Sequence, residues 1–284
     1  MNCLIAVSGS INSEAALRFV NRIASSLSRP ISMLTVVKRE RDRQAAEQAL
    51  AAACQRLIPS IPEVRRLVRV GHPADQIIRE AREGTYDVLI VGQRHDRPAA
   101  TRFLLRSTGV EVAERAPCPV FLVKGSYGLG KAAADSTERI TRMLLCDSNI
   151  SSPNLLSRFT AQLAKLLDGD EDITVLHVMS QITAWPGVPD DQLSASAEEL
   201  IQERTPEGEM LAYDLNLLNA PGIQARARVR HGRVIDQILD EATNGNYDLV
   251  VIGAHRDQGW QRLLLDNIAH QIITHIDRPI LVVR

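Results

Sequence analysis

Short apolar runs alternate with amphipathic stretches along the first half of the chain. The apolar runs have the length of β-strands and lie at 3–7, 31–37, 64–70, 87–91 and 119–123. The stretches between them predict helices at about 13–28, 40–57, 74–83 and 107–115. In the first of these helices, Leu17, Val20, Ala24 and Leu27 fall on one face at helical spacing.

Some of the predicted strands are apolar on both faces, as in DVLIV at 87–91 and LVVIG at 249–253. A strand of this kind is typical of a parallel sheet that helices cover on both sides. Alternation of such strands with helices predicts an α/β fold with an open, doubly wound parallel sheet. Ligands of this architecture bind at the carboxyl ends of the strands.

The second half of the chain repeats the first. Residues 70–92 read VGHPADQIIREAREGTYDVLIVG and residues 231–253 read HGRVIDQILDEATNGNYDLVVIG, at a constant offset of 161. The offset pairs Gly71 with Gly232, Tyr86 with Tyr247, and Asp87 with Asp248. Repetition of this extent indicates two copies of one domain. For the repeated aspartates we expect hydrogen bonding at strand starts and helix ends.

The ends of the repeat set the domain boundaries. CPVFLVK at 118–124 matches RPILVVR at 278–284, and 3–10 matches 143–150. The sequence therefore predicts domains at 1–124 and 139–284, joined by a small, polar, Gly-rich linker at 125–138. The second domain is longer because 180–208 carries an insertion rich in Pro and acidic residues, for which we expect a loop with a helical portion.

The last strand of each domain poses an edge problem. An unpaired terminal strand would expose backbone donors and acceptors along an apolar ribbon. We expect 120–123 and 280–283 to pair antiparallel about a pseudo-two-fold axis, so that one chain forms an intramolecular pseudo-dimer. Whether whole chains also form a homodimer stays open.

Three sequence motifs, by their order, spacing and duplication, make the chain resemble the universal stress protein family over nearly its whole length. They are Y-D followed by an apolar run and Gly at 86–92 and 247–253, the turn glycines Gly71 and Gly232, and S-x8-A-P-C-P-V at 107–120. The resemblance implies two domains of the adenine nucleotide alpha hydrolase-like type. In nucleotide-binding members, an Asp after the first strand meets adenine and G-x2-G-x9-G-[ST] wraps the phosphates through backbone N–H groups.

Carried over residue by residue, that pattern favours the second domain as the nucleotide site. Its implied contacts are Asp147, Val178, Gly253, Arg256, Asp266 and Asn267. Asp266 places a carboxylate where a phosphate is expected, and Arg256 would offset that charge. ATP or AMP is the candidate ligand of this degenerate site, and no cofactor is required.

The first domain departs further from the pattern. Gly92 and Ser107 survive, whereas His95 replaces the second glycine and Ser8 is interpreted as the counterpart of Asp147. This loop is cationic because it carries Arg94, Arg97, Arg102 and Arg106, and a weak site near Arg94 and Arg106 would suit a phosphate or sulfate alone.

The favoured function is a non-catalytic stress-response or regulatory module that acts through an unidentified protein partner. The alternative is an ATP-binding enzyme, with slow ATP hydrolysis or adenylyl chemistry, because SGSINS at 8–13 is similar to the S-G-G-x-D-S loop of ATP pyrophosphatases. Two fixed positions of that loop fail, and a Ser-rich, N-capping turn is the preferred interpretation.

Composition and residue spacing argue against several other classes of function. A formal net charge of −1 gives no electrostatic case for nucleic acid or an anionic membrane. The chain shows no signal peptide and no apolar run of about 20 residues, so we expect a cytoplasmic protein without membrane insertion. The cysteines are scattered and the histidines lack ligand spacing, so no metal site is predicted.

Overall fold

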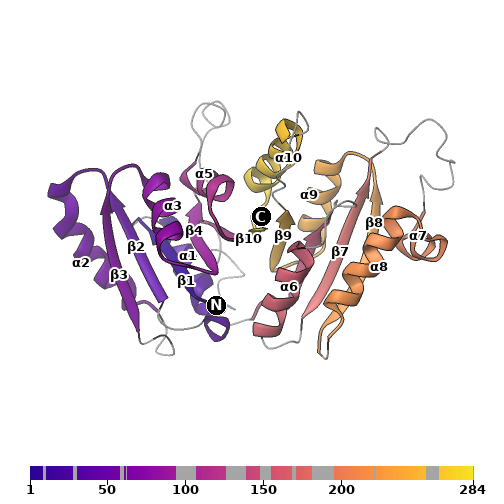
Figure 1. Cartoon of the computed structure of the whole chain (residues 1–284), viewed down its shortest axis with the longest axis horizontal. Helices are drawn as coiled ribbons and strands as arrows, with labels where there is room; N and C mark the ends of the chain where they lie inside the picture. Colours follow the sequence, from indigo (N-terminus) through magenta and orange to yellow (C-terminus); the bar gives the residue numbers. More distant parts are fainter. Residues whose placement is uncertain are drawn as a thin grey trace. The chain divides into compact units, whose positions relative to one another are not determined.

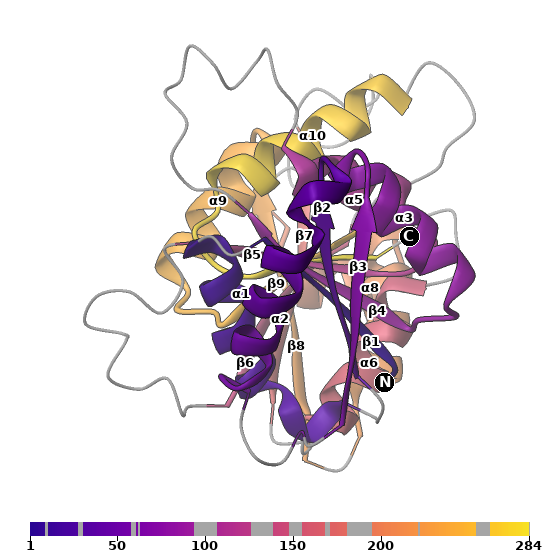
Figure 2. The same cartoon turned by 90° about the vertical axis from the view of Figure 1, so that its left-hand side faces the viewer.

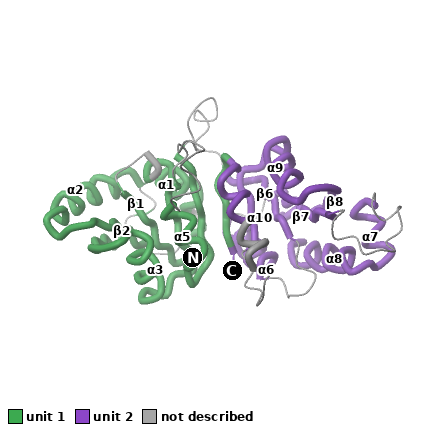
Figure 3. Tube along the Cα trace, turned by 90° about the horizontal axis from the view of Figure 1, so that it is seen from above, with its two compact units in different colours: residues 1–139, 277–282 green, residues 140–276, 283–284 purple. Residues whose placement is uncertain are grey.

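The structure is a computed structural model of the 284-residue chain (Figure 1). It describes residues 1–8, 11–27, 31–57, 61, 63–93, 107–125, 139–147, 155–167, 171–180, 195–220, 222–253 and 262–283, without the side chains of 11, 12, 25 and 262–267. The described chain divides into two compact units, which Figure 3 colours separately. The first comprises 1–139 and 277–282, and the second comprises 140–276 and 283–284. The predicted linker falls almost wholly outside the described residues.

The first unit is a mostly parallel sheet with the strand order β3-β2-β1-β4-β5-β10. Its strands are β1 (Cys3–Val7), β2 (Ile31–Val37), β3 (Val64–Val70), β4 (Val88–Gln93), β5 (Val120–Lys124) and β10 (Ile280–Val283). Its helices are α1 (Ile11–Arg22), α2 (Arg43–Cys54), α3 (Pro73–Glu83) and α5 (Thr108–Arg115). Figure 3 shows α1 and α2 on one side of the sheet and α3 and α5 on the other. Figure 2 views this unit from its β3 edge.

Burial follows strand position. All residues of β1 and β5 are buried, because helices cover both faces there, whereas the edge strand β3 is half-buried or exposed along its length. The fold class predicted from the apolar runs is confirmed.

The last strands of the two repeats pair as predicted. Within the first unit, β10 runs antiparallel to β5, with Ile280 opposite Leu122 and Leu281 opposite Phe121. The β10 segment therefore covers the edge of β5 that would otherwise be open. The other strand pairs of the unit are parallel.

The second unit repeats the plan with the strand order β9-β6-β7-β8. Its strands are β6 (Arg142–Cys146), β7 (Asp172–Met179), β8 (Gln224–His231) and β9 (Leu249–Gly253). Its helices are α6 (Leu155–Leu166), α7 (Ala197–Glu203), α8 (Pro206–Leu218), α9 (Val234–Asn244) and α10 (Arg262–His275). Helix α7, which Ser196 and Glu199 cap reciprocally, supplies the helical portion predicted for the insertion.

The repeated polar residues hold corresponding places in the two units. The Asp87 carboxylate accepts a hydrogen bond from the backbone N–H of Asn2 at 2.7 Å. The Asp248 carboxylate accepts from the N–H groups of Thr141 and Arg142, both at 3.0 Å. The expected strand-start role of these aspartates is confirmed.

Each unit also buries one glutamate against arginine and tyrosine. Tyr86 donates to Glu80 at 3.1 Å, and Tyr247 donates to Glu241 at 2.8 Å. Arg69 donates to Glu80 at 2.8 Å, and Glu241 receives two arginines in the second unit. A buried carboxylate needs such partners because desolvation of an unpaired charge is costly. The tyrosine of the Y-D mark is therefore structural.

The turn after each edge strand requires glycine. Gly71 and Gly232 have φ values of +142° and +130°, which L side chains rarely adopt. We expect Gly71→Ala to lower the free energy of unfolding by about 1–3 kcal/mol through backbone strain. Urea unfolding of the purified chain measures this effect, and a loss below about 0.5 kcal/mol would argue against a strained turn.

No helix in the part of the chain that the structure describes combines the length and the apolar character needed to cross a bilayer.

Candidate functional site

The carboxyl ends of β6 and β9 meet where the strand order of the second unit reverses. Cys146 lies opposite Ile252 of β9 on one side and Leu176 of β7 on the other. Extending both registers by one residue places Asp147 between Gly253 and His177. Two neighbouring strands thus bring the predicted contact residues Asp147 and Gly253 to the carboxyl edge of the sheet, at the position where open α/β sheets bind ligands.

The backbone of Asp147 is fixed from both directions. Its N–H donates to the carbonyl of Leu176 at 3.1 Å, and His177 Nδ1 lies 3.2 Å from its carbonyl oxygen. Burial lowers the pKa of His177, which is 6% exposed, so the imidazole is neutral and Nδ1–H is the donor. Asp147 is itself 4% exposed.

A second buried acidic side chain, which the sequence prediction missed, lies near Asp147. Asp214 of α8 is close enough to Asp147 for the charge of that residue to act on it, and its Oδ1 accepts a hydrogen bond from Ser157 Oγ of α6 at 2.7 Å. Asp214 and Ser157 are both 0% exposed. Burial, and then the Asp147 charge, raise the pKa of Asp214 to about 7.

A signal for Asp214 was present in the sequence. Leu211, Asp214 and Leu218 follow one another at helical spacing, so an acidic residue interrupts an apolar stripe. All three are buried in α8. An ionisable side chain within an apolar stripe indicates either a paired charge or a functional site, and only the fold supplies its partner.

The first unit corrects one prediction. Ala6 lies opposite Val91, and Cys146 lies opposite Ile252. Since Val91 and Ile252 correspond at the 161-residue offset, Val7 is the counterpart of Asp147. The interpretation that Ser8 takes this place is therefore wrong by one residue. The first unit presents an apolar side chain where the second presents a carboxylate.

The serines of the first unit act locally. The Ser8 N–H donates to Ser13 Oγ at 2.7 Å, and the two hydroxyl oxygens are 3.3 Å apart. Ser107 is the N-cap of α5, and its Oγ accepts from the Val110 N–H at 3.3 Å. Gly92 lies in β4 opposite Val123 of β5.

The remaining predicted contacts are described only in part. Val178 is half-buried in β7, opposite Arg230 of β8. Asp266 and Asn267 belong to α10, whose side chains at these positions are outside the described residues. Arg256, together with His95 and the four loop arginines of the first domain, also lies outside the described residues.

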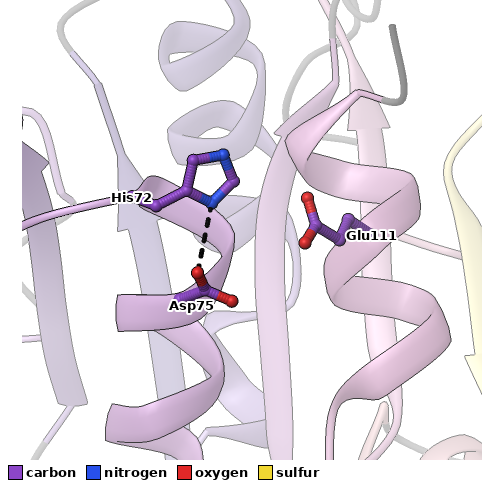
Figure 4. Close-up of side chains that lie close together, drawn as sticks. All are labelled: His72, Asp75 and Glu111. Atoms are coloured by element: carbon purple, nitrogen blue, oxygen red, sulfur yellow. Dashed lines mark ion pairs between the residues drawn. The ribbon is translucent and has the colours of Figure 1, made fainter.

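One side-chain cluster in the first unit departs from the expected absence of metal-ligand geometry. His72 and Asp75 at the start of α3 lie beside Glu111 of α5, with donor atoms within 4.8 Å of one another (Figure 4). Arg115 Nη1 lies 2.9 Å from Asp75 Oδ1 and 2.6 Å from Glu111 Oε1. This guanidinium already compensates the carboxylates, so the group forms an ion-pair cluster between two helices.

The four cysteines are free thiols. Burial raises the pKa of Cys118 to about 12 and also raises the pKa values of Cys3 and Cys146. A thiol that resists ionisation is a poor nucleophile, which agrees with a structural role.

Comparison with known proteins identifies relatives over the whole chain. A family model described as the universal stress protein family matches residues 1–124 and 140–284. A universal stress protein of Mycolicibacterium smegmatis is 25% identical over 304 residues, which covers 99% of this chain and 96% of that protein.

Solved structures agree in fold. A universal stress protein from Archaeoglobus fulgidus is 16% identical, has a TM-score of 0.72, and matches over 100% of this chain and 96% of its own. A functionally unknown protein from Pseudomonas aeruginosa PAO1 is also 16% identical, with a TM-score of 0.60 and coverage of 99% and 92%.

Proposed function

Because the chain belongs to the universal stress protein family, in two consecutive copies, we propose that it is a non-catalytic regulatory module of the stress response whose second half binds an adenine nucleotide. ATP and AMP are the candidate ligands. The proposed site is the crevice at the carboxyl ends of β6 and β9, with Asp147 toward the purine and Gly253 toward the phosphates.

One observation carries the proposal. The strand registers bring Asp147 and Gly253 side by side at the point where strand order reverses, which is the usual ligand position of this architecture. The first unit has Gly92 in the corresponding place but Val7 instead of the acid. A single nucleotide per chain, held by the second unit, is therefore expected.

The non-catalytic part of the proposal rests on the chemistry of the crevice. Among the described residues, His177 uses Nδ1 on a backbone carbonyl and Asp214 is fully buried, so neither is presented to an attacking water. Ser8 and Ser13 hydrogen-bond to one another. The module would act in the cytoplasm by presenting a ligand-dependent surface to a protein partner.

Calorimetry with ATP and with AMP tests the proposal. We expect one site per chain, and at least tenfold weaker binding after Asp147→Ala, because the purine amine loses its acceptor. Ser8→Ala, in the first unit, is the matched control and should bind as the wild type does. Unchanged affinity in the Asp147 variant, or weakened affinity in the Ser8 variant, would contradict the proposed site.

The same purified protein can be used to test the alternative that the chain is an ATP-consuming enzyme. Incubation with ATP, followed by quantification of ADP, AMP and pyrophosphate, should show no turnover above a buffer control. Product formation that Ser8→Ala removes would favour adenylyl chemistry at the first unit, and the non-catalytic proposal would then be wrong.

A further inference from the structure

Three side chains of the first unit turn one imidazole and two carboxylates toward one another (Figure 4). One ligand atom from each of His72, Asp75 and Glu111 lies within 4.8 Å of the other two. The side chains of His72 and Asp75 are 61% and 52% exposed, and that of Glu111 is 23% exposed, so an ion can reach the group from solvent. An imidazole together with carboxylates is a ligand set that zinc accepts.

The spacing of the His72 and Asp75 atoms suits two ligands of one ion. Nδ1 of His72 lies 3.6 Å from Oδ2 of Asp75, which is beyond the roughly 2.7–3.2 Å of a hydrogen bond. Two ligands of one zinc ion, with bonds of about 2.0–2.2 Å at a tetrahedral angle, are about 3.3–3.6 Å apart. Glu111, whose ligand atom lies within 4.8 Å of the others, completes the set by a side-chain movement of about 1.2 Å.

The backbone holds His72 and Asp75 on one face of α3. His72 is the N-cap residue and Asp75 follows three residues later, a spacing that places both side chains on the same side of the first turn. Pro73 restricts His72 to an extended backbone, observed with φ −73° and ψ 127°. The His72 side chain makes no capping hydrogen bond, and its only polar contact within the described part of the chain is Asp75. Its ring nitrogen is therefore available to a ligand.

Arg115 leaves each carboxylate one oxygen for an ion. Its Nη1 contacts Oδ1 of Asp75 and Oε1 of Glu111, whereas the other oxygen of Asp75 lies toward His72. A carboxylate that ligates a metal is commonly held by a hydrogen bond from an outer group, which orients it. Two carboxylates and one guanidinium also give these side chains a net negative charge when the imidazole is neutral, which favours a further cation.

The second unit shows that the fold does not need the imidazole. The offset of 161 pairs His72 with Arg233 and Asp75 with Asp236. Nη1 of Arg233 lies 3.4 Å from Oδ2 of Asp236. A permanent positive charge thus stands beside the aspartate where the first unit has a group that can bind a metal ion. Helix formation at this position is compatible with either residue, so the histidine adds a chemical possibility that the arginine lacks.

We propose that His72, Asp75 and Glu111 bind a zinc ion that joins the start of α3 to α5, with water in the remaining coordination position. The site belongs to the first unit and does not depend on nucleotide binding by the second. The bound ion stabilises the folded unit, because the unfolded chain does not hold the three ligands together. Magnesium binds far more weakly, since it prefers oxygen ligands and retains its water.

Calorimetry with zinc chloride tests the site in the full chain at pH 7.5, after treatment with a chelator and without nucleotide. His72→Arg copies Arg233 of the second unit and therefore suits the fold. We expect at least tenfold weaker zinc binding, since the loss of an outer partner alone costs about 10- to 100-fold. His275→Arg is the matched control, because it removes an exposed histidine and copies Arg115, its counterpart in the first unit. It should bind zinc as the wild type does.

Glu111→Gln tests the third ligand, and it copies Gln271 at the corresponding place of the second unit. It should also weaken zinc binding at least tenfold. Zinc should raise the Tm of the wild type and of His275→Arg more than that of either ligand variant, and magnesium chloride should raise none of them.

Equal zinc affinity in the wild type and in His72→Arg would overturn the proposal. A loss that His275→Arg shares would also overturn it, because binding would then follow the number of exposed histidines. Unchanged binding in Glu111→Gln would overturn the three-ligand site. Each of these outcomes leaves the proposed nucleotide site of the second unit standing, since no nucleotide is present in the experiment.

Discussion

The free energy of unfolding of Asp214→Asn, minus that of the wild type, should increase by about 3 kcal/mol between pH 4.5 and pH 7.5. Burial and the Asp147 charge raise the pKa of Asp214 from 3.8 to about 7. In this window the folded wild type keeps a proton that the unfolded chain gives up, so its stability falls as pH increases. The amide of the variant does not titrate in this pH range.

Urea unfolding at several pH values measures this difference. Taking the variant minus the wild type isolates Asp214 from the other carboxylates, which titrate in both proteins. Asp236→Asn is the matched control, since its side chain is 56% exposed and pairs only at the surface with Arg233. Its difference from the wild type should stay within about 0.5 kcal/mol. A constant difference for Asp214→Asn across the window would contradict the raised pKa of Asp214.

Replacing Glu241 by leucine should lower the free energy of unfolding by about 2–4 kcal/mol. The carboxylate is 2% exposed and accepts from Arg228 at 2.6 Å, Arg230 at 2.8 Å and Tyr247 at 2.8 Å. The substitution leaves these donors without their acceptor. We expect no larger effect because the side chains of Arg228 and Arg230 are 56% and 26% exposed and can form hydrogen bonds with water instead.

Asp240→Asn gives the control for Glu241, because Asp240 pairs with the same Arg230 from a side chain that is 50% exposed. Its cost should stay below about 1 kcal/mol. Glu80→Leu should resemble Glu241→Leu, since Glu80 holds the corresponding place in the first unit. A cost for Glu241→Leu as small as that of the control would show that burial adds nothing to this ion cluster.

The pH dependence of the Glu241 cluster has the opposite sign to that of Asp214. Burial raises the pKa of Glu241, but the hydrogen bonds from Arg230, Tyr247 and Arg228 outweigh it, so the pKa lies below the ordinary 4.5. Its contribution is therefore present above pH 4.5 and lost as pH falls through the folded-state pKa. As pH falls from neutral, Asp214 therefore adds to the stability of the fold, whereas below pH 4.5 the contribution of Glu241 is lost.

The fold could be predicted from the sequence because its signals are local. Apolar runs marked the strands, helical spacing marked the helices, and repetition at a fixed offset marked the duplication. Pairing of β5 with β10 followed from the need to cover an apolar edge, and the structure confirms it. Each of these conclusions depends on spacing along the chain or on backbone hydrogen bonding, which a sequence carries directly.

The candidate site depended on tertiary structure. The match of 3–10 with 143–150 pairs Val7, and not Ser8, with Asp147, and the strand registers agree with this pairing. Asp147 directly follows β6, whereas Ser157 and Asp214 lie in α6 and α8 and are 57 residues apart in sequence. An acid in an apolar stripe can be read from the sequence. Its partner cannot, because the pKa of a carboxyl group depends on burial and on the charge beside it, and both are set by packing between helices and the sheet.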